Sequence, residues 1–408
     1  MVITQLVEPQ IHIADMKPDV PALTGLRGVA ALWVLAFHSW VLTNALPGLG
    51  HDLFGILAGA GYLGVDLFFV LSGFVIALNY APNRLHRSLV SYLEFLWKRL
   101  ARIWPVHLAT SILLGVVILA SVAVGVPLTS VPALSEFFFS MTLTHAWAIP
   151  VPGVWNAVSW SISSEWAAYL CFPAIAWFAL RLRSRLAIVS VSATLFVALG
   201  LAIGAETYPR TMSYGMHRVA AEFTAGVLLF RLWQLSSYGR TSTTWGAAAA
   251  TALFTLIVGG GLLHTAVGFV TALQVLPVLA AVVVAGLAFG DGALVRCLSG
   301  GLMQYLGRIS YSLYLAHGPI MAGAKAVLIE YGWGAAPGAC LLVVATALAL
   351  SLALAHWFYG SIEEPARRAM RSVSLAHPRP RVTGADDRHL GHEERRPAAL
   401  NSTEVFND

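Results

Sequence analysis

An arginine and a histidine lie eleven positions apart in the first apolar run, as Arg27 and His38. Eleven residues make three helical turns to within about 20° of phase and span roughly 16 Å along the axis, so both side chains face the same way. Histidine suits general-base work, because its ordinary pKa lies near neutrality. The simpler interpretation is an interfacial anchor at Arg27 and a structural hydrogen bond at His38.

Two further apolar runs carry acidic side chains, Asp66 and Glu165. A charged group at the centre of a membrane helix costs about 2.5–3.5 kcal/mol on insertion scales, so each one needs a reason. We expect Asp66 to orient His38 and to raise its basicity, as in a catalytic triad. We expect Glu165 to bind the acceptor's hydroxyls or to relay a proton.

A third motif is the pair Arg99 and Arg102, at the start of another apolar run. Residues three apart are neighbours on a helix, so both guanidinium groups can face one anion. The planar fork of arginine suits phosphate groups, of which coenzyme A carries three. The alternative is the basic flank that commonly precedes a membrane helix.

Supporting roles, in acceptor binding or in structure, are expected for Ser72, Trp160, Ser161, Tyr311 and His317. Further ionisable residues inside apolar runs are Glu222 with Arg218, Lys325 and His356. The three cysteines follow no metal-binding spacing, and the sequence contains no Gly-x-Ser-x-Gly, P-loop, Rossmann or His-Glu-x-x-His pattern. We therefore expect no metal.

The elements that position these residues must lie in lipid. Of 408 residues, 58% are hydrophobic and only 11% are charged, whereas soluble domains average about 25% charged residues. The sequence therefore predicts an all-α, polytopic transmembrane helical bundle in the cell (inner) membrane. Its net charge of +5 comes largely from Lys and Arg at the ends of apolar runs, so nucleic acid is not an expected partner.

About ten apolar runs reach the length of about 20 residues that a membrane crossing needs. They cover residues 22–44, 58–80, 103–125, 159–180, 186–204, 217–235, 245–263, 268–289, 305–328 and 337–359. With alternating spans, every basic cluster falls on one side, whereas residues 45–57 and 126–158 contain no Lys or Arg. Because cytoplasmic loops accumulate positive charge, we expect both termini in the cytoplasm.

Three domain-level expectations follow. Residues 1–20 are charged and lack an apolar stretch, so they form a cytoplasmic segment rather than a signal peptide. Residues 21–365 form the transmembrane domain, within which the Pro-rich, aromatic segment 126–158 is a candidate re-entrant or interfacial cover. Residues 366–408 are a basic and then disordered cytoplasmic tail.

These motifs together resemble those of the acyltransferase-3 family of bacterial membrane O-acyltransferases, over about residues 20–365. The resemblance implies use of acyl-CoA at the cytoplasmic face, acylation of a sugar, and a need for the two arginine motifs and the histidine. Some relatives carry an additional SGNH-type domain; this sequence ends soon after its last span, so we expect the membrane unit to complete the transfer. The matching stretches are Arg27 to His38, Gly64 to Phe74, Arg99 to Arg102, Trp160 to Glu165 and Leu306 to His317.

The predicted function is transfer of an acetyl or other short acyl group from acyl-CoA to a hydroxyl of a carbohydrate or glycoside. Arg99 and Arg102, with Arg27, would hold the phosphates, and His38 would take the acceptor's proton or become transiently acylated. The alternative is a multi-pass transporter of a small polar or acylated solute, which spans with ionisable residues at mid-membrane also fit. The lack of a visible inverted repeat makes that alternative weaker.

Overall fold

The structure is a computed structural model, which describes residues 20–43, 53–80, 89–126, 133–147, 155–204, 214–236 and 242–372. Over these ranges it is helical and contains no β-strand. The helices are α1 (Pro21–Thr43), α2 (Leu53–Gly59), α3 (Gly64–Tyr80), α4 (Leu89–Ala123), α5 (Leu134–Met141), α6 (Trp160–Arg181), α7 (Arg185–Gly204), α8 (Gly215–Leu235), α9 (Thr243–Phe254), α10 (Gly260–Val275), α11 (Pro277–Ala288), α12 (Ala293–Leu298), α13 (Gly301–Glu330), α14 (Pro337–Phe358) and α15 (Glu364–Ser372).

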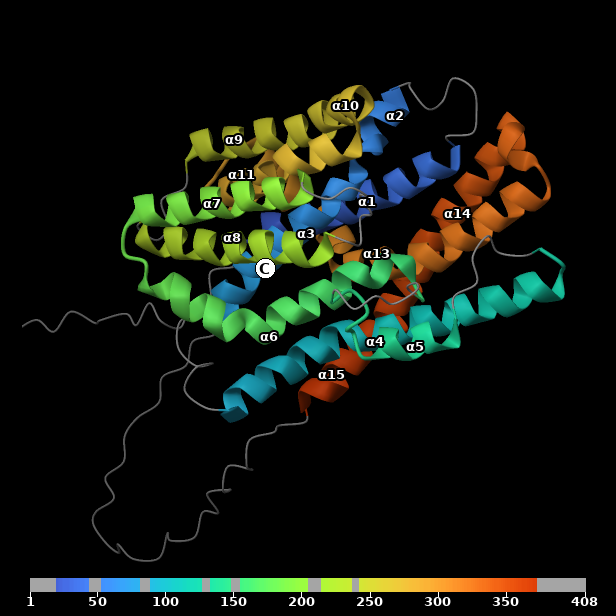
Figure 1. Cartoon of the computed structure of the whole chain (residues 1–408), viewed down its shortest axis with the longest axis horizontal. Coiled ribbons are helices and arrows are strands. Elements are labelled where there is room, and N and C mark those ends of the chain that lie inside the picture. Colours follow the sequence, from blue (N-terminus) through green and yellow to red (C-terminus); the bar gives the residue numbers. More distant parts are fainter. Residues whose placement is uncertain are drawn as a thin grey trace, which may run out of the picture.

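The helices form one bundle (Figure 1), in which α7, α8 and α9 run roughly parallel and α1 packs against α13. Within the described ranges, seven helical stretches are long and apolar enough to cross a membrane. Helices α6 and α8 have 22 and 21 residues, but they carry more polar side chains, such as Glu165 and Arg218. The all-helical, polytopic fold is confirmed, whereas the count of ten spans and the cytoplasmic termini stay predictions.

Several helix boundaries differ from those that hydropathy predicts. Helix α4 begins at Leu89 rather than near residue 103, so Arg99 and Arg102 lie inside a helix and not at its start. The predicted span 268–289 is divided, because α10 ends at Val275 and α11 begins at Pro277. Its first residue, Gly268, also leaves helical geometry, with φ 86°. Proline lacks an N–H group and is favoured at the first helical position. A hydropathy profile detects neither the backbone conformation of a glycine nor the preference of proline for the first turn of a helix.

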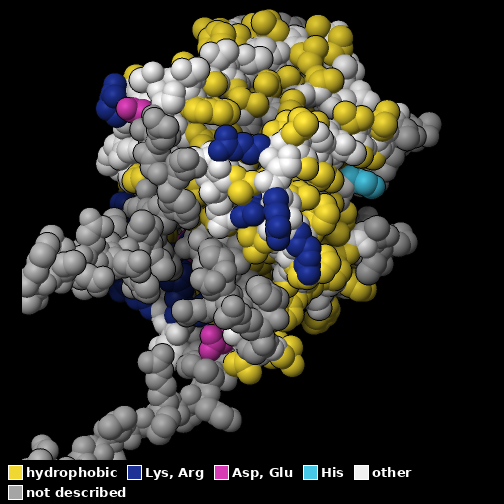
Figure 2. Space-filling view, turned by 90° about the vertical axis from the view of Figure 1, so that its left-hand side faces the viewer, with side chains coloured by type: hydrophobic (Ala, Val, Ile, Leu, Met, Phe, Trp, Pro, Cys, Tyr) yellow, Lys and Arg dark blue, Asp and Glu magenta, His cyan; other side chains and the backbone are white. Residues whose placement is uncertain are grey.

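Basic side chains gather at one end of the bundle. Figure 2 looks at the end that lies at the left of Figure 1 and shows Lys and Arg side chains among hydrophobic ones. Here α6 ends and α7 begins, with Arg181, Arg183 and Arg185 all exposed. A basic face of this kind fits the cytoplasmic side that the sequence predicts for these residues.

The segment predicted as an outer cover lies against α4 and α6 in its described part, which includes α5. His107 of α4 forms a 3.0 Å hydrogen bond through Nε2 to the carbonyl of Ser140, and Ser163 of α6 donates to the carbonyl of Leu143 at 2.9 Å. Residues 127–132 and 148–154 of this segment lie outside the described residues. Its depth in the membrane stays a prediction.

Helices α3 and α8 approach each other most closely at two glycines. A Cβ atom built on Gly73 would lie 2.0 Å from the carbonyl oxygen of Phe223, and one on Gly226 would lie 2.1 Å from that of Val70. Small residues let membrane helices come this close, and van der Waals packing then holds them together. This contact fixes α3, which carries Asp66 and Ser72, against α8, which carries Arg218.

We therefore predict that Gly226→Ala lowers stability, because the new methyl group must displace backbone rather than a flexible side chain. Overpacking of this kind typically costs about 1–3 kcal/mol. The melting temperature of the purified protein in detergent is expected to fall by several degrees. The matched control is Gly338→Ala in α14, where a Cβ atom meets nothing within 4 Å. Equal melting temperatures for the two variants would contradict the prediction.

Candidate active site

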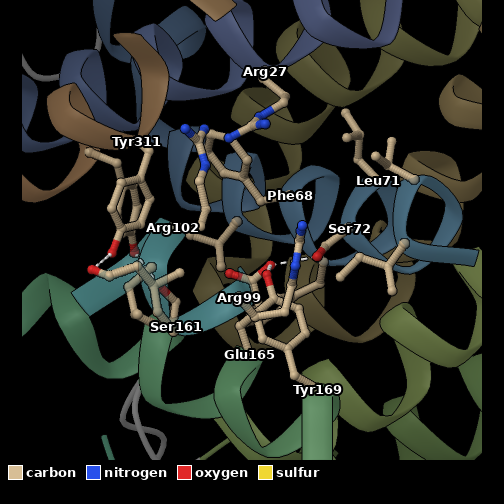
Figure 3. Close-up of a pocket in the computed structure, with 17 residues that line it drawn as sticks. Arg27, Phe68, Leu71, Ser72, Arg99, Arg102, Ser161, Glu165, Tyr169 and Tyr311 are labelled. Atoms are coloured by element: carbon tan, nitrogen blue, oxygen red, sulfur yellow. Dashed lines mark hydrogen bonds between the residues drawn. The ribbon is translucent and has the colours of Figure 1, made fainter. Parts of the chain in front are cut away.

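The three arginines of the sequence motifs line a single cavity of about 100 Å³ among α1, α3, α4, α6 and α13. Figure 3 shows Arg27 from α1 above Arg99 and Arg102 from α4, with Glu165 from α6 in the lower part of the view. We call this space the arginine cavity. Tyr311 and Ser161 also line it, so most of the predicted site residues meet here.

Two of these guanidinium groups have donors to spare. Within the described part of the chain, no carboxylate lies within ion-pair distance of Arg27 or Arg99. Arg99 donates from Nη2 to the hydroxyl of Tyr80 at 3.0 Å, while its buried Nε has no hydrogen-bond partner. Both arginine side chains are partly buried, and a cation removed from water is costly unless an anion pairs with it. The arginine cavity is therefore electrostatically prepared for an anionic ligand.

Arg102 differs, because its guanidinium forms an ion pair with Glu363. Glu363 is 1% exposed and also accepts a 2.6 Å hydrogen bond from the hydroxyl of Ser312. Sequence reasoning missed Glu363, although a carboxylate at the end of the last apolar run was a visible signal. The pair fixes Arg102 beside the ring of Tyr311, whose centroid lies 5.6 Å from Cζ.

Glu165 lies in the arginine cavity as well. Its Oε1 atom accepts hydrogen bonds of 2.5 Å from the hydroxyls of both Ser72 and Tyr169. The sequence predicted that this carboxylate binds the acceptor's hydroxyls or relays a proton, and that role stays a prediction. The structure places it in the cavity that the three arginines also line, where α6 packs against α3 and α4.

His38 lines a second cavity, of about 160 Å³, which we call the histidine cavity. Its walls include Phe37, Trp160 and Arg218. The ring of His317 is adjacent to that of His38, and the two ring centroids lie 4.8 Å apart. Two predicted supporting residues, Trp160 and His317, therefore lie around His38 rather than in the arginine cavity.

The hydrogen bond of His38 determines which ring nitrogen is free. Nδ1 lies 2.9 Å from the carbonyl oxygen of Val34. A carbonyl only accepts, so Nδ1 carries the proton in neutral imidazole and Nε2 keeps its lone pair. This tautomer leaves Nε2 available as a base, without any need for a carboxylate partner.

The two cavities are neighbours, since both are lined by Val65 and Tyr314. The Tyr314 hydroxyl donates to the carbonyl of Val158 at 2.9 Å and so accepts from the hydroxyl of Ser161 at 2.7 Å. Each space is smaller than the roughly 300–1,000 Å³ of common ligand pockets. A long, narrow molecule that passes from one to the other suits this pair better than a compact one.

The predicted partner of Asp66 requires correction. Its carboxylate is held by Arg218, with distances of 3.2 Å from Nε to Oδ1 and 2.6 Å from Nη2 to Oδ2. Both side chains are fully buried. A two-point contact with a guanidinium satisfies both carboxylate oxygens, and Nδ1 of His38 is already bonded to Val34. Asp66 therefore reaches the histidine cavity only through Arg218.

Two other ionisable candidates lie outside both cavities. Lys325 and His356 are exposed on the surfaces of α13 and α14. His356 forms a 2.8 Å hydrogen bond with the hydroxyl of Tyr305. Among the described residues, no group of His, Cys, Asp and Glu side chains forms a metal-binding cluster.

Fold and site together define a polytopic helical membrane protein with a buried, arginine-lined cavity next to a histidine. The chain belongs to the acyltransferase-3 family, whose model, described as an acyltransferase domain, matches residues 20–356. This match covers the residues that line both cavities, but not Glu363, the ion-pair partner of Arg102. Membership of the family makes the chain an enzyme that transfers acyl groups, and it disfavours the transporter alternative.

Curated relatives agree with this assignment. The acyltransferase MdmB of Streptomyces mycarofaciens is 28% identical over 91% of this chain and 97% of its own length. The exopolysaccharide production protein ExoZ of Rhizobium meliloti is 28% identical over 81% of this chain and 96% of its own length. The putative peptidoglycan O-acetyltransferase YrhL of Bacillus subtilis is 26% identical over 89% of this chain, but over only 57% of its own length. No solved structure matches the chain significantly.

Proposed function

We propose that this protein transfers an acetyl or other short acyl group from acyl-CoA to a hydroxyl of a carbohydrate or glycoside. The observation that carries the proposal is the half-buried guanidinium of Arg27 at the wall of the arginine cavity, for which the described part of the chain provides no ion-pair partner. One face of α1 runs from there to His38 at the next cavity. A molecule with an anionic end and a reactive far end fits this path.

In this proposal the phosphate groups of the donor bind Arg27 and Arg99, with Arg102 at their side. The narrow pantetheine arm passes Val65 and Tyr314 and brings the thioester into the histidine cavity. Holding both reactants in a fixed geometry supplies a large part of the rate enhancement in group transfer. Glu165, together with Ser72 and Tyr169, sets the shape of the donor's channel and balances its positive charge.

The chemical step uses the free lone pair of His38. Nε2 removes the proton from the acceptor hydroxyl as its oxygen attacks the thioester carbonyl carbon. When the tetrahedral intermediate collapses, the carbon–sulfur bond breaks and the imidazolium returns the proton to the leaving thiolate. Transient acylation of His38 itself is a variant of this step.

The acceptor class and the orientation are part of the proposal. The names of ExoZ and YrhL refer to exopolysaccharide and peptidoglycan, which supports a saccharide acceptor. The basic end of the bundle (Figure 2) supports entry of the donor from the cytoplasm, with both termini on that side of the inner membrane.

Membranes that contain the protein are therefore expected to move radiolabel from acetyl-CoA, labelled in the acetyl group, into carbohydrate. The label should be released by mild base, as an ester is, and excess unlabelled CoA should reduce its incorporation. Acetyl phosphate, which lacks the pantetheine arm, should not replace acetyl-CoA. Membranes without the protein provide the background. If no acyl-CoA of any chain length labelled carbohydrate above that background, the proposal would be wrong.

A further inference from the structure

Arg218 is a buried arginine that the proposed reaction has not yet used. It lies in α8, is 0% exposed, and lines the histidine cavity together with His38. Three contacts fix its orientation. Nε and Nη2 are bonded to the carboxylate of Asp66, and Cζ lies 5.2 Å from the centroid of the Trp160 ring.

The third nitrogen of this guanidinium, Nη1, takes no part in these contacts. Nη1 is buried and has no hydrogen-bond partner within the described part of the chain. Buried donors are nearly always satisfied, and an orphan in a native structure needs an explanation. Nη1 carries two N–H bonds, and its guanidinium belongs to the wall of the cavity in which His38 offers its lone pair. The explanation that fits is a partner present only during the reaction.

We infer that Nη1 of Arg218 donates to the carbonyl oxygen of the donor's thioester and stabilises the oxyanion that develops there. The inference rests on the proposed acyl transfer and adds the residue that carries its electrostatic stabilisation. Donors aimed at developing charge in a site without water usually make the largest single contribution to catalysis. A guanidinium already held in place by Asp66 does not have to reorganise during the reaction.

The electrons and protons balance around the two residues. The acceptor oxygen forms its bond to the carbonyl carbon while Nε2 of His38 takes the hydroxyl proton. The π electrons of the carbonyl move to its oxygen, where Nη1 of Arg218 donates to the negative charge. On collapse, the carbonyl re-forms, the carbon–sulfur bond breaks, and the thiolate takes the proton from His38. The products are the ester and free CoA.

This inference gives Asp66 a function as a positioning residue. Sequence reasoning expected Asp66 to orient the base, whereas the contacts have it orient Arg218 through two nitrogens and leave the third free. Glu222, one turn further along α8, has its Oε1 atom 4.0 Å from Nε of Arg218. As in a catalytic triad, a carboxylate orients a catalytic side chain. Here that side chain is the guanidinium that stabilises the oxyanion, and not the base.

The test compares Arg218→Lys with the double variant Asp66→Asn/Arg218→Met. Lysine keeps the positive charge but lacks the planar fork, so it cannot bond Asp66 and reach the oxyanion together. The double variant removes the charges of Asp66 and Arg218 together, so the Asp66 carboxylate is not left buried and unpaired. We expect kcat to fall by roughly 10²-fold in both, with the KM for acyl-CoA within about threefold of wild type. The matched control is Arg231→Lys, the same change in the same helix, where the side chain bonds the carbonyl of Leu182.

A second measurement separates catalysis from structure. An S-alkyl-CoA thioether lacks the carbonyl oxygen, so its affinity should be the same for wild type and for Arg218→Lys. The melting temperature of the double variant should stay close to that of wild type. A kcat within about threefold of wild type in either variant, or a loss of affinity for the thioether that accounts for the whole defect, would overturn the inference. Failure of the proposed function would look different, because wild type itself would then transfer no label.

Discussion

Replacing His38 with Ala is expected to lower acyl transfer by about 10³-fold or more, the upper part of the range for removal of a general base. The effect should be large because Nε2 is the unprotonated nitrogen in the histidine cavity. The neighbouring His317 is not among the residues that line either cavity, so it cannot take over this role. The loss should appear in kcat, since His38 lies away from the arginines that bind the donor. Initial rates with saturating acetyl-CoA measure it.

The matched control for this prediction is His356→Ala, because His356 is exposed on α14 and lies outside both cavities. Its activity should equal that of wild type. Rapid quenching of the wild-type reaction without an acceptor would also distinguish the two versions of the mechanism. Acid-labile label on the protein that is absent from the His38 variant indicates an acyl-histidine, whereas its absence indicates general-base catalysis. Transfer within tenfold of wild type in His38→Ala would remove the histidine from the mechanism.

Replacing Arg27 with Gln is expected to reduce kcat/KM for acyl-CoA by roughly 10³-fold. Truncating one partner of a buried, hydrogen-bonded charge pair costs about 2–5 kcal/mol, and Arg102, which is committed to Glu363, cannot replace Arg27 beside the phosphate. The defect should lie mainly in KM, because binding of the phosphates is the same in the ground state and the transition state. Steady-state kinetics at varied donor concentration separate the two parameters.

A donor without phosphates makes the test of Arg27 specific. Acetyl-pantetheine keeps the thioester and most of the arm, so it should be a poor substrate for wild type and an equally poor one for Arg27→Gln. Arg181→Gln is the control, because Arg181 is exposed at the end of α6 and stacks on Trp177. If Arg27→Gln impaired acetyl-pantetheine as strongly as acetyl-CoA, Arg27 would have a structural role or act on the acyl group instead.

Much of the site was predictable from local sequence. The phase of Arg27 and His38 on one helix, and of Arg99 and Arg102 on another, follows from the 3.6-residue repeat and needs no tertiary information. The composition likewise requires a helical membrane bundle, because the backbone in lipid must bond within its own segment. Family membership follows from the same short motifs.

Only the tertiary structure determines which charged side chains pair with one another. Asp66 bonds Arg218, which is 152 residues away in sequence, and Arg102 bonds Glu363, which is 261 residues away. Glu165 lines the same cavity as the arginines because of how α6 meets α3 and α4. Hydropathy and helical phase are properties of one segment, so they tell which face a charged group occupies. They carry no information about the partner that another helix brings to that face. In a buried site each cation needs an anion. A guanidinium that meets a carboxylate from another helix is satisfied, whereas one without such a partner is free to bind a ligand.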